Sequence, residues 1–256
     1  MKILVCVKQV PDPDEPVVPD VSGQWLAPGA GRWTMNRLDA FAMEHALVLK
    51  DTAGATVEAV SVGPDRAEAV VRRALAMGAG AGFLAPMDER FPDPMAVAAL
   101  LAGLARQRQP DLILCGAMSE DSMAGVTGPM LAALLFLPFA SSVVEIAPAG
   151  SGQSIIRAVR ELEGGMAEEL EIRLPAVLSI QSSGITPRYP VLSHVLRANK
   201  QEIFRPEAGA PFLPQPRLRS LETALPPPPP PGRFLTGTAA EKAEKLCDIL
   251  MQRGLL

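Results

Sequence analysis

The 256-residue chain has few of the residues that build metal centres, disulfide frameworks and aromatic binding surfaces. Its three cysteines, Cys6, Cys115 and Cys247, lie far apart and form no CxxC pair, so we expect a reducing compartment and no disulfide framework. The two histidines, His45 and His194, leave no His-rich metal site, and we expect no metal. Aromatic residues make up 4% of the chain, which excludes a protein that stacks bases or sugars on many rings.

A basic charge balance and long uninterrupted apolar runs are also missing. The formal net charge of −4 excludes a basic nucleic-acid footprint, so we expect no nucleic-acid partner. The N-terminal apolar run ends at Lys8, which is too short for a signal peptide and favours a cytoplasmic protein. Ser122 to Val144 carries no charge, but glycines and prolines interrupt it. A buried helix followed by a buried strand is therefore favoured over a membrane span.

The first half of the chain alternates predicted strands and helices. Apolar runs predict buried strands at Lys2–Val7, Thr56–Val62, Gly82–Ala85 and Asp111–Cys115. Helices are predicted to begin at caps Asn36, Asp65 and Asp93 and at Gly128-Pro129. This alternation predicts βαβ units and a doubly wound, mainly parallel, Rossmann-like α/β sheet.

After Pro138 the pattern changes to an antiparallel hairpin extension. Strands are predicted at Ser141–Ile146, Ser154–Arg160 and Glu168–Arg173, with a further buried strand at Ala176–Ile180. From about Arg188 the chain has no regular pattern. We expect an α/β nucleotide-binding domain over residues 1–205.

The remainder, residues 206–256, is predicted to be a C-terminal arm. Pro226–Pro231 is a run of six prolines, which forms a stiff extended spacer. Thr238 and Glu241 predict a capping box at the start of an amphipathic helix. Because one such helix on a spacer cannot stabilise itself, we expect it to dock on another chain.

The candidate ligand site lies where the first, second and fourth predicted strands end. In a parallel α/β sheet the loops after these strands meet at one edge and bind ligands there. The third loop reads CGAMSEDSMAGVTGP, and its small residues let backbone amides approach a phosphate. It matches neither a Walker loop nor GxGxxG, so an ordinary Gly-rich connection is the alternative. No GxSxG elbow, HExxH or His–Cys pair is present, so no catalytic residue is predicted.

Several segments carry a family resemblance, in order, along residues 1–205. They are CVKQVPD (Cys6–Asp12), MNRLDAFAMEHALVLK (Met35–Lys50), SVGP (Ser61–Pro64), RALAMGA (Arg73–Ala79), PDLILCG (Pro110–Gly116), TGPMLAALL (Thr127–Leu135), RELEGGMAEELEIRLPAV (Arg160–Val177) and PRY (Pro187–Tyr189). With them the chain resembles the β subunit of electron-transfer flavoproteins, which has an adenine-nucleotide α-hydrolase-like fold.

The resemblance implies an electron carrier rather than an enzyme by itself. This chain would pair with an α subunit that holds most of an FAD, would bind AMP and would present a recognition loop to flavin-dependent dehydrogenases. The nucleotide contacts it implies are Cys6, Asn36, Arg37, Leu38, Asp39, Val62, Asp121, Ser122, Met123, Ala124, Gly125, Val126, Thr127, Gly128, Pro129 and Met130. The recognition contacts it implies are Gly184, Ile185, Thr186, Arg188 and Tyr189.

The chain departs from the family pattern in the third loop. Ala117, Met118, Met123 and Val126 stand where the family has Lys or Arg, Gln, Asp and Gln, so the phosphate would rest mainly on backbone amides. The segment Asp93–Val97 is similar to the AMP-type DPLAV and favours AMP.

Two alternatives stay open. The opening CVKQVPD is closer to the electron-bifurcating branch, in which this chain would carry a second FAD and the complex would oxidise NADH. The alternative of another class is a stand-alone nucleotide-binding module.

Overall fold

A computed structural model describes residues 1–22, 26–27, 31–87, 93–149, 154–182, 184–206, 218, 224–232 and 234–256. The chain divides into two compact units, 1–223 and 224–256, and each is described by itself. The domain boundary expected between residues 205 and 206 stays a prediction, because most residues from 207 to 223 lie outside the described part.

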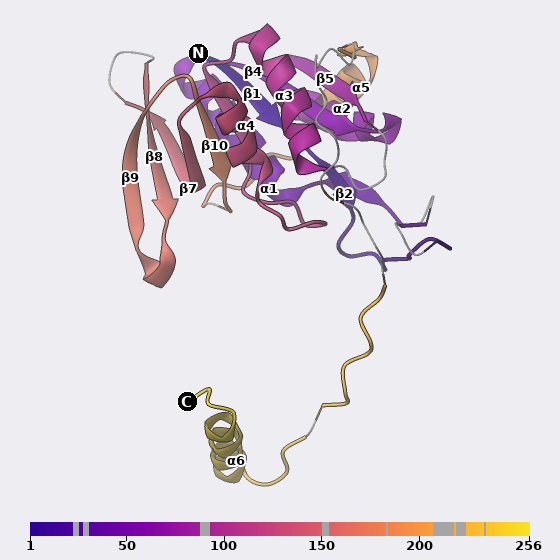
Figure 1. Cartoon of the computed structure of the whole chain (residues 1–256), viewed down its shortest axis with the longest axis vertical. Coiled ribbons are helices and arrows are strands. Elements are labelled where there is room, and N and C mark those ends of the chain that lie inside the picture. Colours follow the sequence, from indigo (N-terminus) through magenta and orange to yellow (C-terminus); the bar gives the residue numbers. More distant parts are fainter. Residues whose placement is uncertain are drawn as a thin grey trace. The chain divides into compact units, whose positions relative to one another are not determined.

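The first unit is built on a central sheet (Figure 1). Its strands are β1 (Lys2–Cys6), β4 (Thr56–Gly63), β5 (Ala81–Pro86), β6 (Leu112–Gly116), β7 (Phe139–Pro148), β8 (Ile155–Glu161), β9 (Ala167–Arg173), β10 (Ala176–Ile180) and β11 (Ile203–Phe204). Among the described residues their order is β11-β5-β4-β1-β6-β10-β7-β8-β9. Neighbours from β11 to β7 pair in parallel, and β8 and β9 add an antiparallel extension. The predicted fold class is confirmed.

Helices cover both faces of this sheet. They are α1 (Arg37–Ala53), α2 (Glu68–Met77), α3 (Pro94–Arg108), α4 (Thr127–Leu135) and α5 (Leu192–Lys200). Ile3 and Val5 of β1 belong to one hydrophobic core with α1, α2 and α5, whereas Leu4 and Cys6 belong to a second core with α3 and α4. Successive side chains of a strand point to opposite faces, so a strand with a core on each side must be apolar throughout. This explains the uninterrupted apolar run at the N-terminus.

Some elements differ from the sequence predictions. The strand β7 pairs in parallel with β10 on one side and antiparallel with β8 on the other, so it belongs to both parts of the sheet. Asp65 does not cap α2: it begins a short 3-10 turn (Asp65–Ala67), and its carboxylate accepts a hydrogen bond from Arg205.

One helix and three strands were not predicted. They are α5, the two-residue edge strand β11, and the two strands of a short antiparallel ladder, β2 (Gln9–Pro11) and β3 (Trp33–Met35). The residue at the N-cap of α5 is Val191, which has no side chain that could cap the helix, and Ala198 is the one buried residue of α5. A three-residue strand and an exposed helix without a cap leave no periodic signal in the sequence.

The second unit holds the helix α6 (Ala239–Gln252). Its predicted capping box is confirmed: the Thr238 side chain accepts from the Glu241 N–H, and the Glu241 carboxylate accepts from the Thr238 N–H. None of its side chains is buried, and Leu246 and Met251 are 48% and 63% exposed. In the part of the chain that is described, no helix is long and apolar enough to cross a membrane.

Candidate functional site

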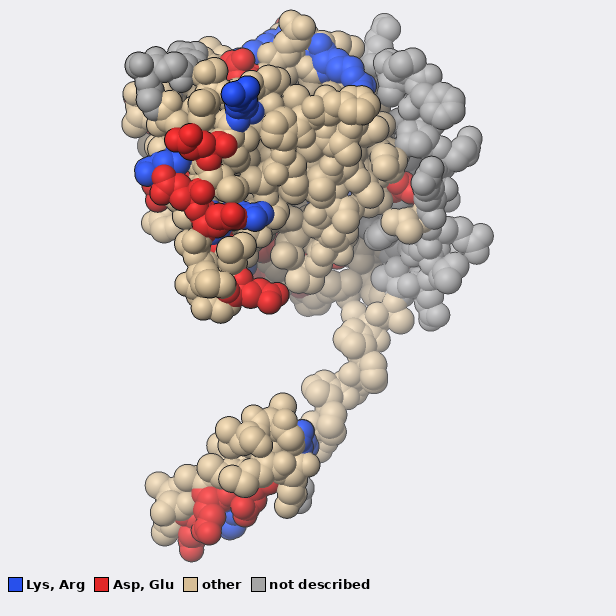
Figure 2. All heavy atoms as spheres, turned by 60° about the vertical axis from the view of Figure 1, so that its left-hand side comes forward, with Lys and Arg blue, Asp and Glu red and all other residues tan. Residues whose placement is uncertain are grey.

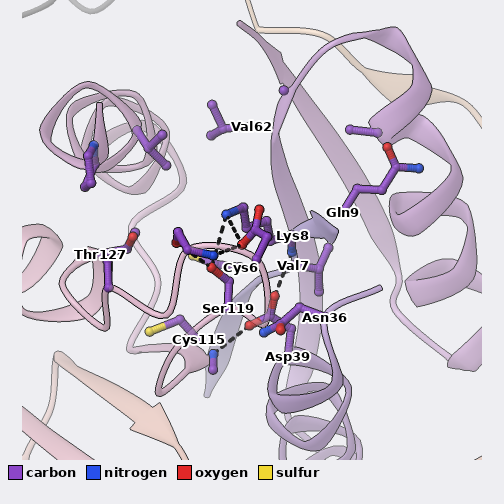
Figure 3. Close-up of a pocket in the computed structure, with 18 of the residues that line it drawn as sticks. Cys6, Val7, Lys8, Gln9, Asn36, Asp39, Val62, Cys115, Ser119 and Thr127 are labelled. Atoms are coloured by element: carbon purple, nitrogen blue, oxygen red, sulfur yellow. Dashed lines mark hydrogen bonds and ion pairs between the residues drawn. The ribbon is translucent and has the colours of Figure 1, made fainter. Parts of the chain in front are cut away.

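A cavity of about 250 Å³ lies at the carboxyl ends of β1, β4 and β6. These strands place Cys6, Val62 and Cys115 in its wall (Figure 3). Loop 117–127, between β6 and α4, and the first turns of α3 complete the wall. The strands β4 and β5 lie on one side of β1 and β6 lies on the other, so the cavity is at the topological switch point, where parallel α/β sheets bind ligands.

The structure brings ten of the predicted nucleotide contacts together around this cavity. They are Cys6, Asn36, Asp39, Val62, Asp121, Ser122, Ala124, Gly125, Val126 and Thr127. The other six, Arg37, Leu38, Met123, Gly128, Pro129 and Met130, are not among its lining residues. Met123 is 69% exposed, and the Arg37 guanidinium forms an ion pair with Glu120 at 3.4 Å. Which of these residues touch a ligand stays a prediction.

Asp39 ties the loops after β1 and β6 together beneath the cavity. Its carboxylate accepts hydrogen bonds from the backbone N–H of Lys8 (2.7 Å) and of Gly116 (2.8 Å) (Figure 3). A Cβ on Gly116 would lie 2.5 Å from Asp39 Oδ1, so only glycine permits this approach. Asp39 is 5% exposed, and burial raises its pKa to about 6, although both backbone N–H groups lower it.

Asn36 has a different local role from the one predicted. It occupies the N-cap position of α1, but its side chain makes no capping hydrogen bond. Its amide instead donates to the Met118 carbonyl (3.0 Å) and accepts from the Glu120 N–H (3.1 Å). The buried Asn36 side chain therefore fixes the shape of loop 117–127, because it satisfies two backbone groups of that loop.

Lys8 supplies a cation to the same loop. Its ammonium donates to Asp121 Oδ1 (2.7 Å) and to Ser119 Oγ (3.1 Å). Burial alone would raise the pKa of Asp121, but the Lys8 charge and hydrogen bonds from Lys8, Ser119 and Ser122 lower it below its ordinary value. Position 117 is Ala rather than Lys or Arg, and the Lys8 ammonium, from the loop after β1, contacts this loop instead.

The cavity also has a polar end, whose residues were not among the predicted contacts. Gln9, Trp33 and Arg66 line it, and the Arg66 guanidinium carbon lies 3.3 Å from the Trp33 ring centroid. Gln9 and Arg66 follow the ends of β1 and β4, so their position after the carboxyl ends of neighbouring strands was the available signal. Trp33 had no such signal, because it lies in the short ladder β2–β3.

Cys6 and Cys115 form part of the apolar floor of the cavity. Both are buried. Burial raises the pKa of the Cys115 thiol to about 12 and raises that of Cys6 well above its ordinary value. Both side chains therefore stay protonated near neutral pH and cannot act as thiolate nucleophiles.

The predicted recognition segment lies away from this cavity. Within this segment Arg188 is held by ion pairs and hydrogen bonds. Its backbone N–H and its guanidinium both donate to the buried Glu44 carboxylate, and its Nη2 also donates to Asp51 (2.9 Å). Its neighbours are exposed, with Tyr189 at 87% and Leu192 at 73%. The segment thus combines a fixed backbone with exposed large side chains.

Comparisons with known proteins identify the family of this chain. The family model described as "Electron transfer flavoprotein domain" matches residues 26–210. The chain belongs to the electron transfer flavoprotein family, as a β subunit. It is 31% identical to "Electron transfer flavoprotein subunit beta" of Bacillus subtilis, over 98% of this chain and 97% of that protein. It is 35% identical to the same subunit of Bradyrhizobium diazoefficiens, over 79% of this chain and 80% of that protein.

Another relative of this electron transfer flavoprotein subunit carries a different name. It is "Caffeyl-CoA reductase-Etf complex subunit CarD" of Acetobacterium woodii, 32% identical over the whole of both chains. Membership of the family establishes a role in electron transport for this β subunit.

Proposed function

We propose that this β subunit forms a heterodimer with an α subunit that holds most of the FAD, and that the heterodimer accepts electrons from dehydrogenases. We further propose that the cavity of this chain holds AMP as a structural nucleotide. The observation that carries the AMP proposal is the cavity itself, which joins the carboxyl ends of β1, β4 and β6 to a polar loop beside α4. A ligand that binds only the folded state stabilises it.

Several features favour AMP over a second FAD. A cavity of about 250 Å³ suits a mononucleotide better than FAD, which has more than twice as many atoms as AMP. The cavity wall from α3 is apolar, with Pro94, Val97 and Leu101. A flavin ring on this wall would find no hydroxyl partner there.

The phosphate of AMP would bind near loop 117–127 and the start of α4. Val126, at the N-cap of α4, offers no side-chain cap, so the first N–H groups of the helix can receive an anion. Thr127 lines the cavity at this end. The Lys8 ammonium, which contacts the same loop through Ser119 and Asp121, would supply the positive charge that position 117 lacks.

Replacing Lys8 tests this arrangement. We expect Lys8→Met to weaken AMP binding about 10- to 100-fold, because a charge-assisted hydrogen bond contributes roughly 1.5–3 kcal/mol, and to leave adenosine binding unchanged. Lys8→Met/Asp121→Asn removes the uncompensated carboxylate as well, and we expect it to bind AMP as weakly as the single variant. Calorimetric titration of the nucleotide-free heterodimer measures both ligands.

Lys200→Met, on the exposed end of α5, is the matched control and should bind AMP like the wild type. Unchanged AMP affinity in Lys8→Met would contradict the proposed phosphate site. Recovery of full affinity in the double variant would show that Asp121 repulsion, rather than loss of the cation, caused the effect.

The second candidate is a bifurcating complex, with a second FAD in this cavity and NADH as the electron donor. The opening CVKQVPD favours it. Two relatives are named as subunits of CoA reductase systems: CarD, and "Acryloyl-CoA reductase electron transfer subunit gamma" of Anaerotignum propionicum, which is 30% identical over the whole of both chains. A stand-alone nucleotide-binding module is the least supported alternative. None of the side chains of α6 is buried, and an amphipathic helix of this kind is expected to dock on a partner chain.

Two surfaces of the first unit suit the proposed partners. For dehydrogenases, we propose Gly184–Tyr189 together with Leu192, since Arg188 fixes the backbone while Tyr189 and Leu192 stay exposed. For the α subunit, Figure 2 shows a broad uncharged area beside the charged face of the β8–β9 hairpin. Phe136, at the end of α4, is 94% exposed. Large exposed apolar side chains are typical of protein interfaces.

A further inference from the structure

Three side chains from different elements form one packed group at an end of the cavity. Trp33 comes from β3, Gln9 from β2 and Arg66 from the turn after β4. The Arg66 guanidinium carbon lies 3.3 Å from the Trp33 ring centroid. The Gln9 amide donates to the Arg66 carbonyl (2.9 Å) and accepts from Arg66 Nη1. All three line the cavity. The guanidinium is therefore held in one orientation at the cavity wall.

This group lies on the other side of the cavity from the end where the phosphate is proposed to bind. Figure 3 shows Gln9 and Thr127 on opposite sides of the cavity, with Lys8 and Ser119 between them. A nucleotide whose phosphate binds beside Thr127 must direct its other end, the base, away from that loop. The apolar residues Val62 and Pro64 line the cavity near Arg66 in the sequence.

We propose that Arg66, held by Trp33 and Gln9, is a base-binding residue of this cavity, and that its ligand class is a purine nucleotide; the proposal rests on the AMP site proposed above. A planar guanidinium stacks on aromatic rings, and its N–H groups donate to ring nitrogens. Because Trp33 and Gln9 fix the side chain before the ligand arrives, little conformational entropy is lost on binding. Arg66 thus contributes to recognition of the base and not to binding of the phosphate.

A pair of ligands separates base binding from phosphate binding. AMP and ribose 5-phosphate share the phosphate and the sugar, but ribose 5-phosphate has no base. We expect Arg66→Ala to weaken AMP about 10-fold and to leave ribose 5-phosphate unchanged. Arg66→Lys keeps the charge without the planar group, so we expect it to lose nearly as much AMP affinity as Arg66→Ala. Lys8→Met should weaken both ligands, because both carry the phosphate.

The measurement is calorimetric titration of the full-length heterodimer after removal of its nucleotide. Arg157→Ala, at a half-buried position of β8 where the arginine pairs with Glu145 and Glu169, is the control for loss of an arginine outside the cavity and should bind AMP like the wild type. A thermal unfolding midpoint for each variant shows that it is folded. Gln9→Leu removes the amide that orients Arg66 and should weaken AMP less than Arg66→Ala does, again without effect on ribose 5-phosphate.

Each outcome decides between the two proposals. If the wild type binds AMP and folded Arg66→Ala binds it equally well, the base-binding role is wrong and the AMP site stands. If Arg66→Ala weakens ribose 5-phosphate as much as AMP, Arg66 binds the phosphate and the inference is also wrong. If the wild type binds neither ligand, the proposed AMP site itself fails. Full AMP affinity in Arg66→Lys would show that charge alone suffices, which contradicts recognition by the planar group.

Discussion

Deletion of residues 226–256 is expected to weaken the association of this chain with its α subunit more than 100-fold. The helix α6 buries none of its own side chains, and Leu246 and Met251 are 48% and 63% exposed. Burial of three or four such side chains on a partner contributes about 1.5–3 kcal/mol each, part of which ordering of the arm offsets. The measurement is the dissociation constant of the purified subunits, by sedimentation or by calorimetry.

Two variants refine this test. Leu246→Glu puts a charge on the apolar side of α6, and we expect most of the deletion's effect from this one change. Replacing Pro226–Pro231 by a Gly-Ser segment of equal length makes the spacer flexible but keeps its reach, so a loss of less than about 10-fold is expected. Unchanged association of the deleted chain would exclude a docking role for the arm.

Asp39→Asn is expected to change how the stability of this chain depends on pH. The pKa of Asp39 is about 6 in the folded chain and 3.8 as its ordinary value. Between these pH values the folded state binds more protons than the unfolded state, so the contribution of Asp39 to stability is present at low pH and is lost as pH rises through 6. From pH 4.5 to 7.5 the loss amounts to roughly 2 kcal/mol.

Asparagine does not titrate, so the variant does not lose this part of its stability as the pH rises from 4.5 to 7.5. It also offers one acceptor to the two N–H groups of Lys8 and Gly116, which makes it the less stable protein at pH 4.5. The difference between the two unfolding midpoints should therefore shrink by about 4–8 °C from pH 4.5 to 7.5. A difference between wild type and Asp39→Asn that stays constant with pH would contradict the raised pKa.

The sequence carried enough signal for the sheet and for the main wall of the cavity. Lys2–Val7 and Asp111–Cys115 are apolar without interruption because each has a hydrophobic core on both faces. Asp93 with Pro94 marked the start of α3, where the Asp93 carboxylate accepts from the Met95 N–H (2.8 Å). The carboxyl ends of these strands then predicted where the cavity lies.

The features of the site that were not predicted depend on contacts between segments that lie far apart in the sequence. Asn36 looked like a helix cap, but its amide satisfies backbone groups of loop 117–127, which lies about eighty positions later in the sequence. Lys8 and Arg66 follow the ends of β1 and β4, which the sequence placed at one edge of the sheet, but no local pattern distinguishes them from the other residues of those loops. No local pattern encodes the stack of Arg66 on Trp33.

The central claim, that this chain holds AMP while the FAD is held mainly by the α subunit, is tested most directly by the nucleotide content of the co-purified heterodimer. The complex is denatured, its nucleotides are separated by chromatography, and flavin is quantified by absorbance. The proposal predicts one FAD and one AMP per heterodimer, and a colourless preparation of this chain alone. Two FAD and no AMP would contradict it and would favour the alternative with a second flavin.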